Sequence, residues 1–274
     1  MSETPLRWSL EDIDFSRLEP AAAEPELLAA VKTAALVEAN SADYVTYLHN
    51  VFRGDEAFCA AASHWGVEEA QHGAALARWA EAIDPTFDFA ASLAHFRATY
   101  SLPLDTSTSV RGSRAGELLA RCVVESGTCS YYSALRDHTR EPVLRQICHH
   151  IAQDEAHHYR LFRQHYQHYP RPALLARLRI ALGRVVETGD DEFGRAWYSA
   201  NHAGAAEAPA YDRAACAGRY QSIVTGLYGE RHVRTVVHMI AQAVGARPGS
   251  RLARWVGTLG WWWLRRRGAA GAAA

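Results

Sequence analysis

The sequence has no long hydrophobic run, no CxxC pair and only one lysine, Lys32. A membrane-spanning helix needs about 20 consecutive apolar residues. The nearest approach, residues 256–264, contains glycine and is followed by three arginines. The five cysteines are odd in number, and residues 1–14 are polar and acidic, unlike a signal peptide. We therefore expect buried, reduced thiols and a cytoplasmic protein, without a disulfide framework.

Charge is nearly balanced over the whole chain but unevenly distributed along it. The formal net charge is −1, so it gives no indication of nucleic-acid binding, and we expect no such partner. Residues 1–90 carry 5 basic and 16 acidic side chains, whereas residues 91–274 carry 24 basic and 14 acidic ones. The apolar fraction of 49% is typical of a chain that buries a core, which excludes a disordered or fibrous protein.

The sequence also lacks long stretches in which β-branched and polar residues alternate, and alanine, leucine, arginine and glutamate dominate it. This composition predicts an all-α fold. Helix start and stop signals such as Gly54, Pro85 and Pro170 divide the chain, and residues 189–194 are expected to form a surface connection. The predicted helices cover residues 24–52, 55–83, 89–100, 113–138, 141–169, 173–187, 209–228, 230–245 and 250–267.

Two of the predicted helices contain the motif Glu-x-x-His, once at Glu69 and His72 and again at Glu155 and His158. Residues three apart on a helix face the same way, so each motif directs one carboxylate and one imidazole to the same side. A single copy is weak evidence for a metal site, because glutamate and histidine are common on solvated helix faces. The second copy of the motif strengthens the interpretation as a metal site.

Each motif has a partner glutamate in the preceding helix. Glu38 lies 31 residues before Glu69, and Glu125 lies 30 residues before Glu155. The midpoints of both intervals fall at the predicted turns, near residues 53–54 and 140. Because residues equidistant from the turn lie side by side in an antiparallel helix pair, both hairpins should bring a glutamate beside a Glu-x-x-His motif.

Two such hairpins, offset by 86–87 residues, predict a ferritin-like four-helix bundle with four glutamates and two histidines at its centre. This is the ligand set of di-iron carboxylate bundles, and hard carboxylates with a few imidazoles suit two Fe ions, with Mn as the alternative. Small and apolar neighbours disfavour the other reading, in which the six residues lie on solvated faces. The predicted metal ligands are Glu38, Glu69, His72, Glu125, Glu155 and His158.

The acidic residues Glu68 and Asp154 stand directly before the two motif glutamates. Either could accept a hydrogen bond from the far nitrogen of a ligand histidine. The alternative for both is a solvated carboxylate. We expect an N-terminal arm (1–23), the bundle (24–169, with a crossover connection at 86–112) and a C-terminal helical extension (170–274) within the same domain.

Three stretches of the sequence are similar to those of a known family. They are Trp65-Gly-Val-Glu-Glu-Ala-Gln-His72-Gly73, Ile151-Ala-Gln-Asp-Glu-Ala-His-His158 and Glu125-Ser-Gly-Thr128. Over residues 30–168 the chain resembles the soluble acyl-carrier-protein desaturases of the ferritin-like superfamily. The resemblance implies that Thr128 faces the oxygen-binding side of the metal pair, where it would deliver a proton or position oxygen. The alternative for Thr128 is a core hydroxyl.

The resemblance further implies an O2-dependent di-iron oxidase, a desaturase or hydroxylase of an acyl or other lipidic chain. Acyl carrier protein is then a candidate carrier, a protein such as ferredoxin a candidate electron donor, and a homodimer the expected assembly. The alternative is a ferritin- or rubrerythrin-like protein that oxidises iron or scavenges peroxide without an organic substrate. The roughly 100 residues after the bundle argue against a storage-cage subunit.

Residues 250–267 combine tryptophans at helical spacing, such as Trp255 and Trp263, with several arginines. This pattern is typical of a helix that lies on an anionic membrane surface. It also suits docking of an acidic carrier protein. The third alternative is a helix that packs on the bundle.

Overall fold

The computed structural model describes residues 5–186, 191–204, 207–247 and 249–271, which form helices and connections without any β-strand. The all-α prediction is therefore confirmed for these ranges. None of the helices in them is both long enough and apolar enough to span a membrane.

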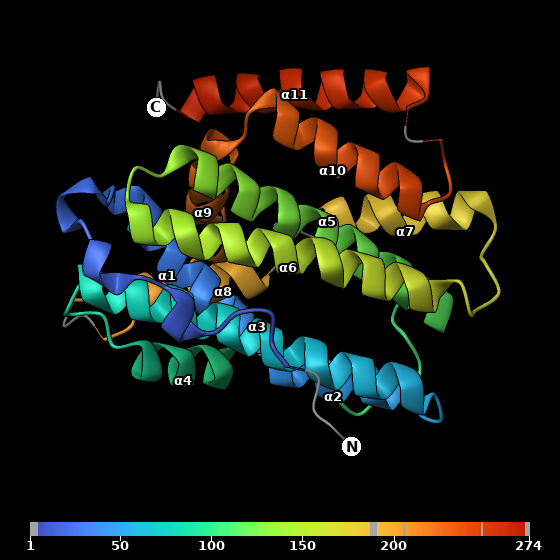
Figure 1. Ribbon diagram of the computed structural model, residues 1–274, viewed down its shortest axis with the longest axis horizontal. Helices are drawn as coiled ribbons and strands as arrows, with labels where there is room; N and C mark the ends of the chain where they lie inside the picture. The colour runs from blue at the N-terminus through green and yellow to red at the C-terminus, as the bar shows by residue number, and fades with distance from the viewer. Residues whose placement is uncertain (1–4, 187–190, 205–206, 248, 272–274) are drawn as a thin grey trace. The chain divides into compact units, whose positions relative to one another are not determined.

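The helices follow the predicted order, apart from a division near residue 40 and an additional helix over residues 191–201 (Figure 1). Asp55 accepts a hydrogen bond from the Phe58 amide at 3.0 Å, and Ser113 Oγ accepts one from the Gly116 amide at 3.0 Å, so the helices predicted from residues 55 and 113 each begin with a side-chain cap. Three short 3-10 turns, Leu10–Asp12, Phe15–Arg17 and Pro20–Ala22, precede the first α-helix. The α-helices are α1 (Pro25–Ala39), α2 (Ser41–Val51), α3 (Glu56–Ile83), α4 (Phe89–Thr99), α5 (Arg114–His138), α6 (Pro142–Tyr166), α7 (Leu174–Val186), α8 (Asp191–Asn201), α9 (Arg213–Leu227), α10 (Glu230–Ala243) and α11 (Arg251–Gly271).

The single helix predicted over residues 24–52 is instead two helices, α1 and α2, separated at Asn40. The Arg97 guanidinium donates to the Ala39 carbonyl at 2.8 Å and to Asn40 Oδ1 at 3.3 Å. The hydroxyl of Ser41 donates to the Gly66 carbonyl at 2.9 Å. These long-range hydrogen bonds stabilise the interruption, so no glycine or proline is needed there to mark it.

The surface connection predicted at residues 189–194 is wrong for its second half, because residues 191–194 form the first turn of α8. Gly189 and its neighbour at position 190 lie outside the described residues. A Cβ at Gly194 would lie 2.7 Å from the hydroxyl of Tyr211, so the glycine permits this close approach. Tyr211 in turn donates to Asp191, and Tyr44 donates to Glu192 at 2.7 Å. Tertiary contacts thus stabilise a helix in a Gly/Asp-rich stretch.

The chain packs as two compact units. Unit 1 comprises Met1–Ser107, Thr139–His150 and Gly189–Ile223. Within it, α1 and α2 pack against α3, and α8 packs against α1 and α4. The indole of Trp79 in the core donates to Glu141 at 2.6 Å, and the same carboxylate accepts the Leu144 amide at 2.6 Å, which caps the first turn of α6. Fully buried side chains of its core include Leu36, Phe52, Phe58, Leu76 and Trp79.

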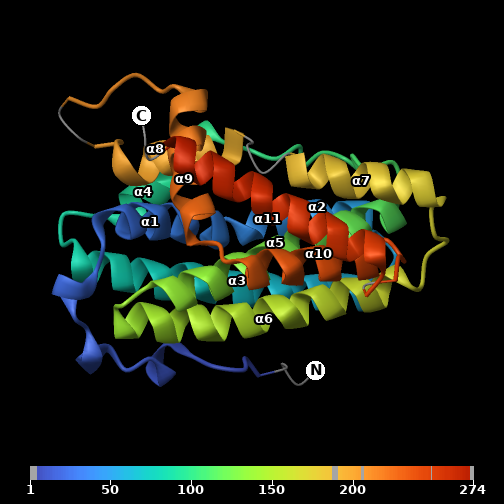
Figure 2. The same cartoon turned by 90° about the horizontal axis from the view of Figure 1, so that it is seen from above.

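Unit 2 comprises Thr108–His138, Ile151–Thr188 and Val224–Ala274, so that α6 contributes residues to both units. Within it, α5 packs against α7 and α10, and α11 lies along α10, as Figure 2 shows. Ser130 donates to the His232 carbonyl at 3.0 Å, and the imidazole of His232 lies 2.9 Å from Asp137, which ties α10 to α5. Although α11 packs on α10, it leaves Trp255 and Leu259 exposed.

Candidate metal centre

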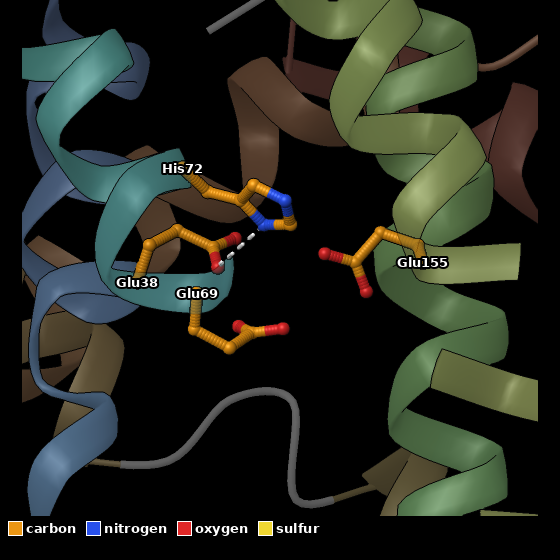
Figure 3. A group of neighbouring side chains, drawn as sticks. All are labelled: Glu38, Glu69, His72 and Glu155. Atoms are coloured by element: carbon orange, nitrogen blue, oxygen red, sulfur yellow. Dashed lines mark ion pairs between the residues drawn. The ribbon is translucent and has the colours of Figure 1, made fainter. Parts of the chain in front are cut away.

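Unit 1 brings together three of the predicted ligands, Glu38 on α1 and Glu69 and His72 on α3 (Figure 3). His72 Nδ1 lies 3.8 Å from Glu38 Oε2, and one ligand atom from each of the three residues lies within 4.8 Å of the others. All three are buried, His72 completely. We call this group the unit-1 half-site.

The close approach of α1 and α3 at this half-site depends on Gly73, the residue after His72. A Cβ there would lie 2.7 Å from the Ala39 amide nitrogen and 3.0 Å from the Ala35 carbonyl oxygen. The absent side chain lets the two helix backbones come together one residue away from Glu38. As a result, the carboxylate of Glu38 lies beside the imidazole of His72.

The N-terminal arm covers the unit-1 half-site, which sequence reasoning missed. The Trp8 ring stacks on His72 with ring centroids 6.1 Å apart, and on His150 at 5.1 Å. Arg7 forms an ion pair with Glu68 at 2.9 Å. The only signal for this contact in the sequence was Trp8 itself, a large apolar side chain within a polar arm. Its indole now shields the imidazole from water.

Glu68, predicted to support a ligand histidine, is buried and lies between two basic side chains. Besides its ion pair with Arg7, its carboxylate lies 3.6 Å from His64 Nε2, one turn earlier on α3. Its hydrogen bond to a ligand histidine stays a prediction. Asp154, the corresponding residue of α6, is also buried, with 2% of its surface exposed.

Unit 2 brings together the other three predicted ligands, Glu125 on α5 and Glu155 and His158 on α6. His158 Nδ1 lies 3.6 Å from Glu125 Oε2 and 3.8 Å from Glu155 Oε2. One ligand atom from each residue lies within 4.8 Å of the others, and each residue has 1% of its surface exposed. This unit-2 half-site therefore repeats the donor set and the spacing of the unit-1 half-site.

Thr128 lies one turn after Glu125 on α5, and its hydroxyl donates to Glu155 Oε2 at 2.5 Å. The same hydroxyl is 3.3 Å from the carbonyl oxygens of Val124 and Glu125. Thr128 therefore contacts a predicted ligand directly, and its hydroxyl fixes one oxygen of the Glu155 carboxylate.

The electrostatics of the unit-2 half-site favour a bound cation. Burial and the nearby Glu155 carboxylate together raise the pKa of Glu125 to about 8, although His158 opposes the shift. Within the described residues, the buried Glu125 Oε1 has no hydrogen-bond partner. Burial, with the nearby charge of Glu155, also raises the pKa of Cys129 to about 11. A buried carboxylate is costly unless a cation or hydrogen bonds compensate it.

The geometry of both half-sites fits a metal ion. Divalent metals such as zinc bind nitrogen and oxygen ligands at about 2.0–2.2 Å, so two ligand atoms of one ion are up to about 4.4 Å apart. The measured separations of 3.6–3.8 Å between imidazole nitrogen and carboxylate oxygen are too long for hydrogen bonds but lie within this limit. The buried Glu/His groups could therefore hold a metal ion.

No protein-family model matches the chain, and comparison with curated proteins returned no significant match. Function is therefore inferred from the residues of the two half-sites and from their geometry.

Proposed function

We propose that the two half-sites together supply the ligand set of a ferritin-like four-helix bundle and hold two iron ions. The repetition of the half-site is the observation that carries this proposal. Each half-site supplies two carboxylates and one imidazole, with His72 and His158 both at i+3 from a glutamate. In each, the imidazole Nδ1 lies 3.6–3.8 Å from the glutamate of the partner helix.

The chemistry of the donor set favours iron, with manganese as the alternative. Four carboxylates and two imidazoles are hard or borderline ligands, whereas a softer metal would select thiolates. Two cysteines of α5, Cys122 and Cys129, lie within the electrostatic influence of Glu125, and burial raises the pKa of both thiols. They therefore stay protonated and apolar, and serve to exclude water.

The reaction we propose is the O2-dependent oxidation of an acyl or other lipidic chain by desaturation or hydroxylation. A reduced iron pair, when bound, supplies oxygen activation and the oxidising power to break an unactivated C–H bond. The protein residues hold the metals, exclude water and place a proton. Trp8 covers His72 from one side, and Thr128 carries an exchangeable proton at Oγ1, directly on Glu155.

Thr128 has two roles in this proposal. Its hydrogen bond to Glu155 Oε2 orients this carboxylate beside the other ligands of the unit-2 half-site. Its hydroxyl proton lies directly at a predicted ligand, since Oγ1 is 2.5 Å from Glu155 Oε2. The similarity of Glu125-Ser-Gly-Thr128 to the desaturase pattern supports the same assignment.

The acyl substrate, acyl carrier protein as its carrier, a donor such as ferredoxin and a homodimeric assembly all follow from the desaturase resemblance. The basic C-terminal part of the chain, with its exposed Trp255 on α11, is the surface where an acidic carrier or a membrane would dock.

Metal stoichiometry tests the paired site. Purified protein would be loaded with Fe(II) under anaerobic conditions, desalted and measured by mass spectrometry of the metal. We expect two Fe per chain in the wild type and one or fewer in Glu125→Gln. The matched control is Glu117→Gln, because Glu117 is also buried on α5 but has partners of its own, Ser109 at 2.7 Å and Arg121 at 3.5 Å.

The control variant should keep both ions. Full loading of Glu125→Gln, with a wild-type circular dichroism spectrum, would contradict the metal assignment.

Product analysis tests the reaction. The iron-loaded protein would be supplied with reductant, O2 and acyl substrates on acyl carrier protein, coenzyme A and phospholipid, and the acyl chains would be analysed by gas chromatography. Unsaturated or hydroxylated chains are the expected result. Rapid ferroxidase turnover without an organic product on any of the three carriers would replace the proposed oxidase with iron oxidation.

A further inference from the structure

Unit 2 contains a cavity of about 310 Å³ formed by the last turn of α6 and the residues after it, α7 and the C-terminal end of α10. None of its lining residues belongs to either half-site. Its remaining wall is built from the small residues Ala243, Gly245 and Ala246. The polar side chains that line it are Arg163, Tyr166, Gln167, Arg171, Arg177 and Gln242.

The cavity is strongly cationic. Arg163, Arg171 and Arg177 line it, and no lining residue is acidic. Within the part of the chain that the structure describes, none of these three guanidinium groups forms an ion pair with a carboxylate. Three like charges around one cavity repel one another, and a bound anion would relieve this repulsion.

Tyr166 adds a buried donor to the same cavity. Only 3% of this residue is exposed, and its hydroxyl has no hydrogen-bond partner among the described residues. The buried Nε of Arg177 likewise has none. Burial raises the pKa of Tyr166, against the opposing charges of Arg177 and Arg171, so its hydroxyl stays protonated and can donate. Buried donors without acceptors are costly, and an oxyanion would satisfy several of them at once.

The backbone at the end of α10 places Arg177 against the cavity. Gly245 has a φ of +78° and donates to the Gln242 carbonyl, while the Ala246 amide donates to Ala241, as in a Schellman motif. A Cβ at Gly245 would lie 2.5 Å from Arg177 Nη1. The glycine thus both ends the helix and leaves room for the guanidinium.

We propose that this cavity binds a phosphate monoester, with the guanidinium groups of Arg163, Arg171 and Arg177 on the phosphate oxygens and the Tyr166 hydroxyl as a further donor. Planar guanidinium forks match phosphate oxygens in pairs, which a compact ammonium does not. The cavity also has room for a small organic group attached to the phosphate. The proposal does not depend on the metal centre.

The phosphate could come from a soluble ester or from a lipid headgroup. The second source is suggested by α7, which carries Arg177 and exposes apolar side chains along its length. The exposed residues include Leu174, Leu175, Leu178, Leu182, Val185 and Val186. Both sources present the same chemistry to the arginines, so the experiment has one arm for each.

The soluble arm titrates inorganic phosphate and glycerol 3-phosphate into the full-length protein at constant ionic strength, with calorimetry as the readout. Loss of one charge-assisted hydrogen bond typically costs tenfold or more in affinity, so we expect about a tenfold or greater weakening in Arg177→Gln. Tyr166→Phe, which removes only a hydroxyl, should weaken binding by about threefold to tenfold. The matched control Arg179→Gln, on the same helix but exposed and outside the cavity, should bind as the wild type does.

The lipid arm measures sedimentation with phosphatidylcholine vesicles that contain or lack phosphatidic acid. Binding that requires phosphatidic acid and is lost in Arg177→Gln, but kept in Arg179→Gln, assigns the lipid source. Binding of the soluble phosphates alone, with the same dependence on Arg177, assigns the soluble source. The proposal requires that at least one probe binds at up to about 10 mM phosphate, and that Arg177→Gln and Tyr166→Phe both weaken this binding while their circular dichroism stays native. If neither probe meets these conditions, the proposal is overturned.

Discussion

The same substitution, glycine to alanine, should have opposite effects at two positions next to the half-sites. Gly73 follows His72 on α3, and Gly127 precedes Thr128 on α5. A Cβ at Gly73 would meet the backbone of α1, whereas a Cβ at Gly127 would meet nothing within 4 Å. The pair therefore separates the helix-forming tendency of alanine from the steric requirement of the site.

The expected magnitudes follow from these distances. At Gly73 the new Cβ would be 2.7 Å from the Ala39 nitrogen, 2.9 Å from the Ala39 Cβ and 3.0 Å from the Ala35 oxygen. Ordinary contacts are about 3.5–4.0 Å, so α1 has to retreat by about 0.5–1 Å. Overpacking of this kind costs about 1–3 kcal/mol, and the gain in helix propensity returns up to about 1 kcal/mol. The net loss of unfolding free energy should be about 1–2 kcal/mol, against a gain of about 0.5–1 kcal/mol for Gly127→Ala.

Urea unfolding followed by circular dichroism measures both changes, and iron loading provides a second readout. Because Glu38 is on the displaced helix, Gly73→Ala should also bind iron more weakly, while Gly127→Ala should load as the wild type does. The reasoning would be refuted if Gly73→Ala were as stable as the wild type and kept its full iron content. That result would mean that α1 and α3 are not packed closely beside His72.

Three further outcomes test other parts of the structure. Hydrogen bonds from Lys32 and Thr86 lower the pKa of Asp84 from 3.8 to about 2, so these contacts stabilise the fold above about pH 4 and lose this contribution as the pH falls toward 2. Accordingly, Lys32→Met should lower the free energy of unfolding by about 1–2 kcal/mol at pH 6, as measured by urea unfolding. The difference from wild type should shrink at pH 3. Cys59 is the one cysteine of five that is not buried, so a thiol reagent should label about one thiol per native chain rapidly and the others only after unfolding. Trp79→Phe removes the indole N–H that donates to the fully buried Glu141 at 2.6 Å. This loss should lower the unfolding free energy by about 1–3 kcal/mol.

Much of each half-site could be predicted because its information is local. Glu69 and His72 are three residues apart, so helical periodicity alone places them on one face. The position of Glu38 beside them follows from equal distances to a turn that Gly54 and the cap at Asp55 mark in the sequence. The same reasoning applied to Glu125 and the second motif, and the observed distances agree with it.

The parts that were missed depend on contacts between residues far apart in the sequence. The break at Asn40 is stabilised by Arg97, 57 residues later, and the turn at Asp191 by Tyr211, 20 residues later. Neither partner is within reach of a local pattern, so the sequence signals favoured a continuous helix in the first case and a loop in the second. The stacking of Trp8 on His72 belongs to the same class.

The sequence by itself determined the all-helical fold, most helix boundaries and the two repeated Glu-x-x-His motifs, because hydrophobic periodicity, caps and helix breakers act over a few residues. Only the tertiary structure decided how tightly α1 approaches α3, which residue covers His72, and that three arginines and Tyr166 surround one cavity. These features depend on the distances between side chains from separate elements. Such distances are set by packing, which a pattern of residue types does not specify.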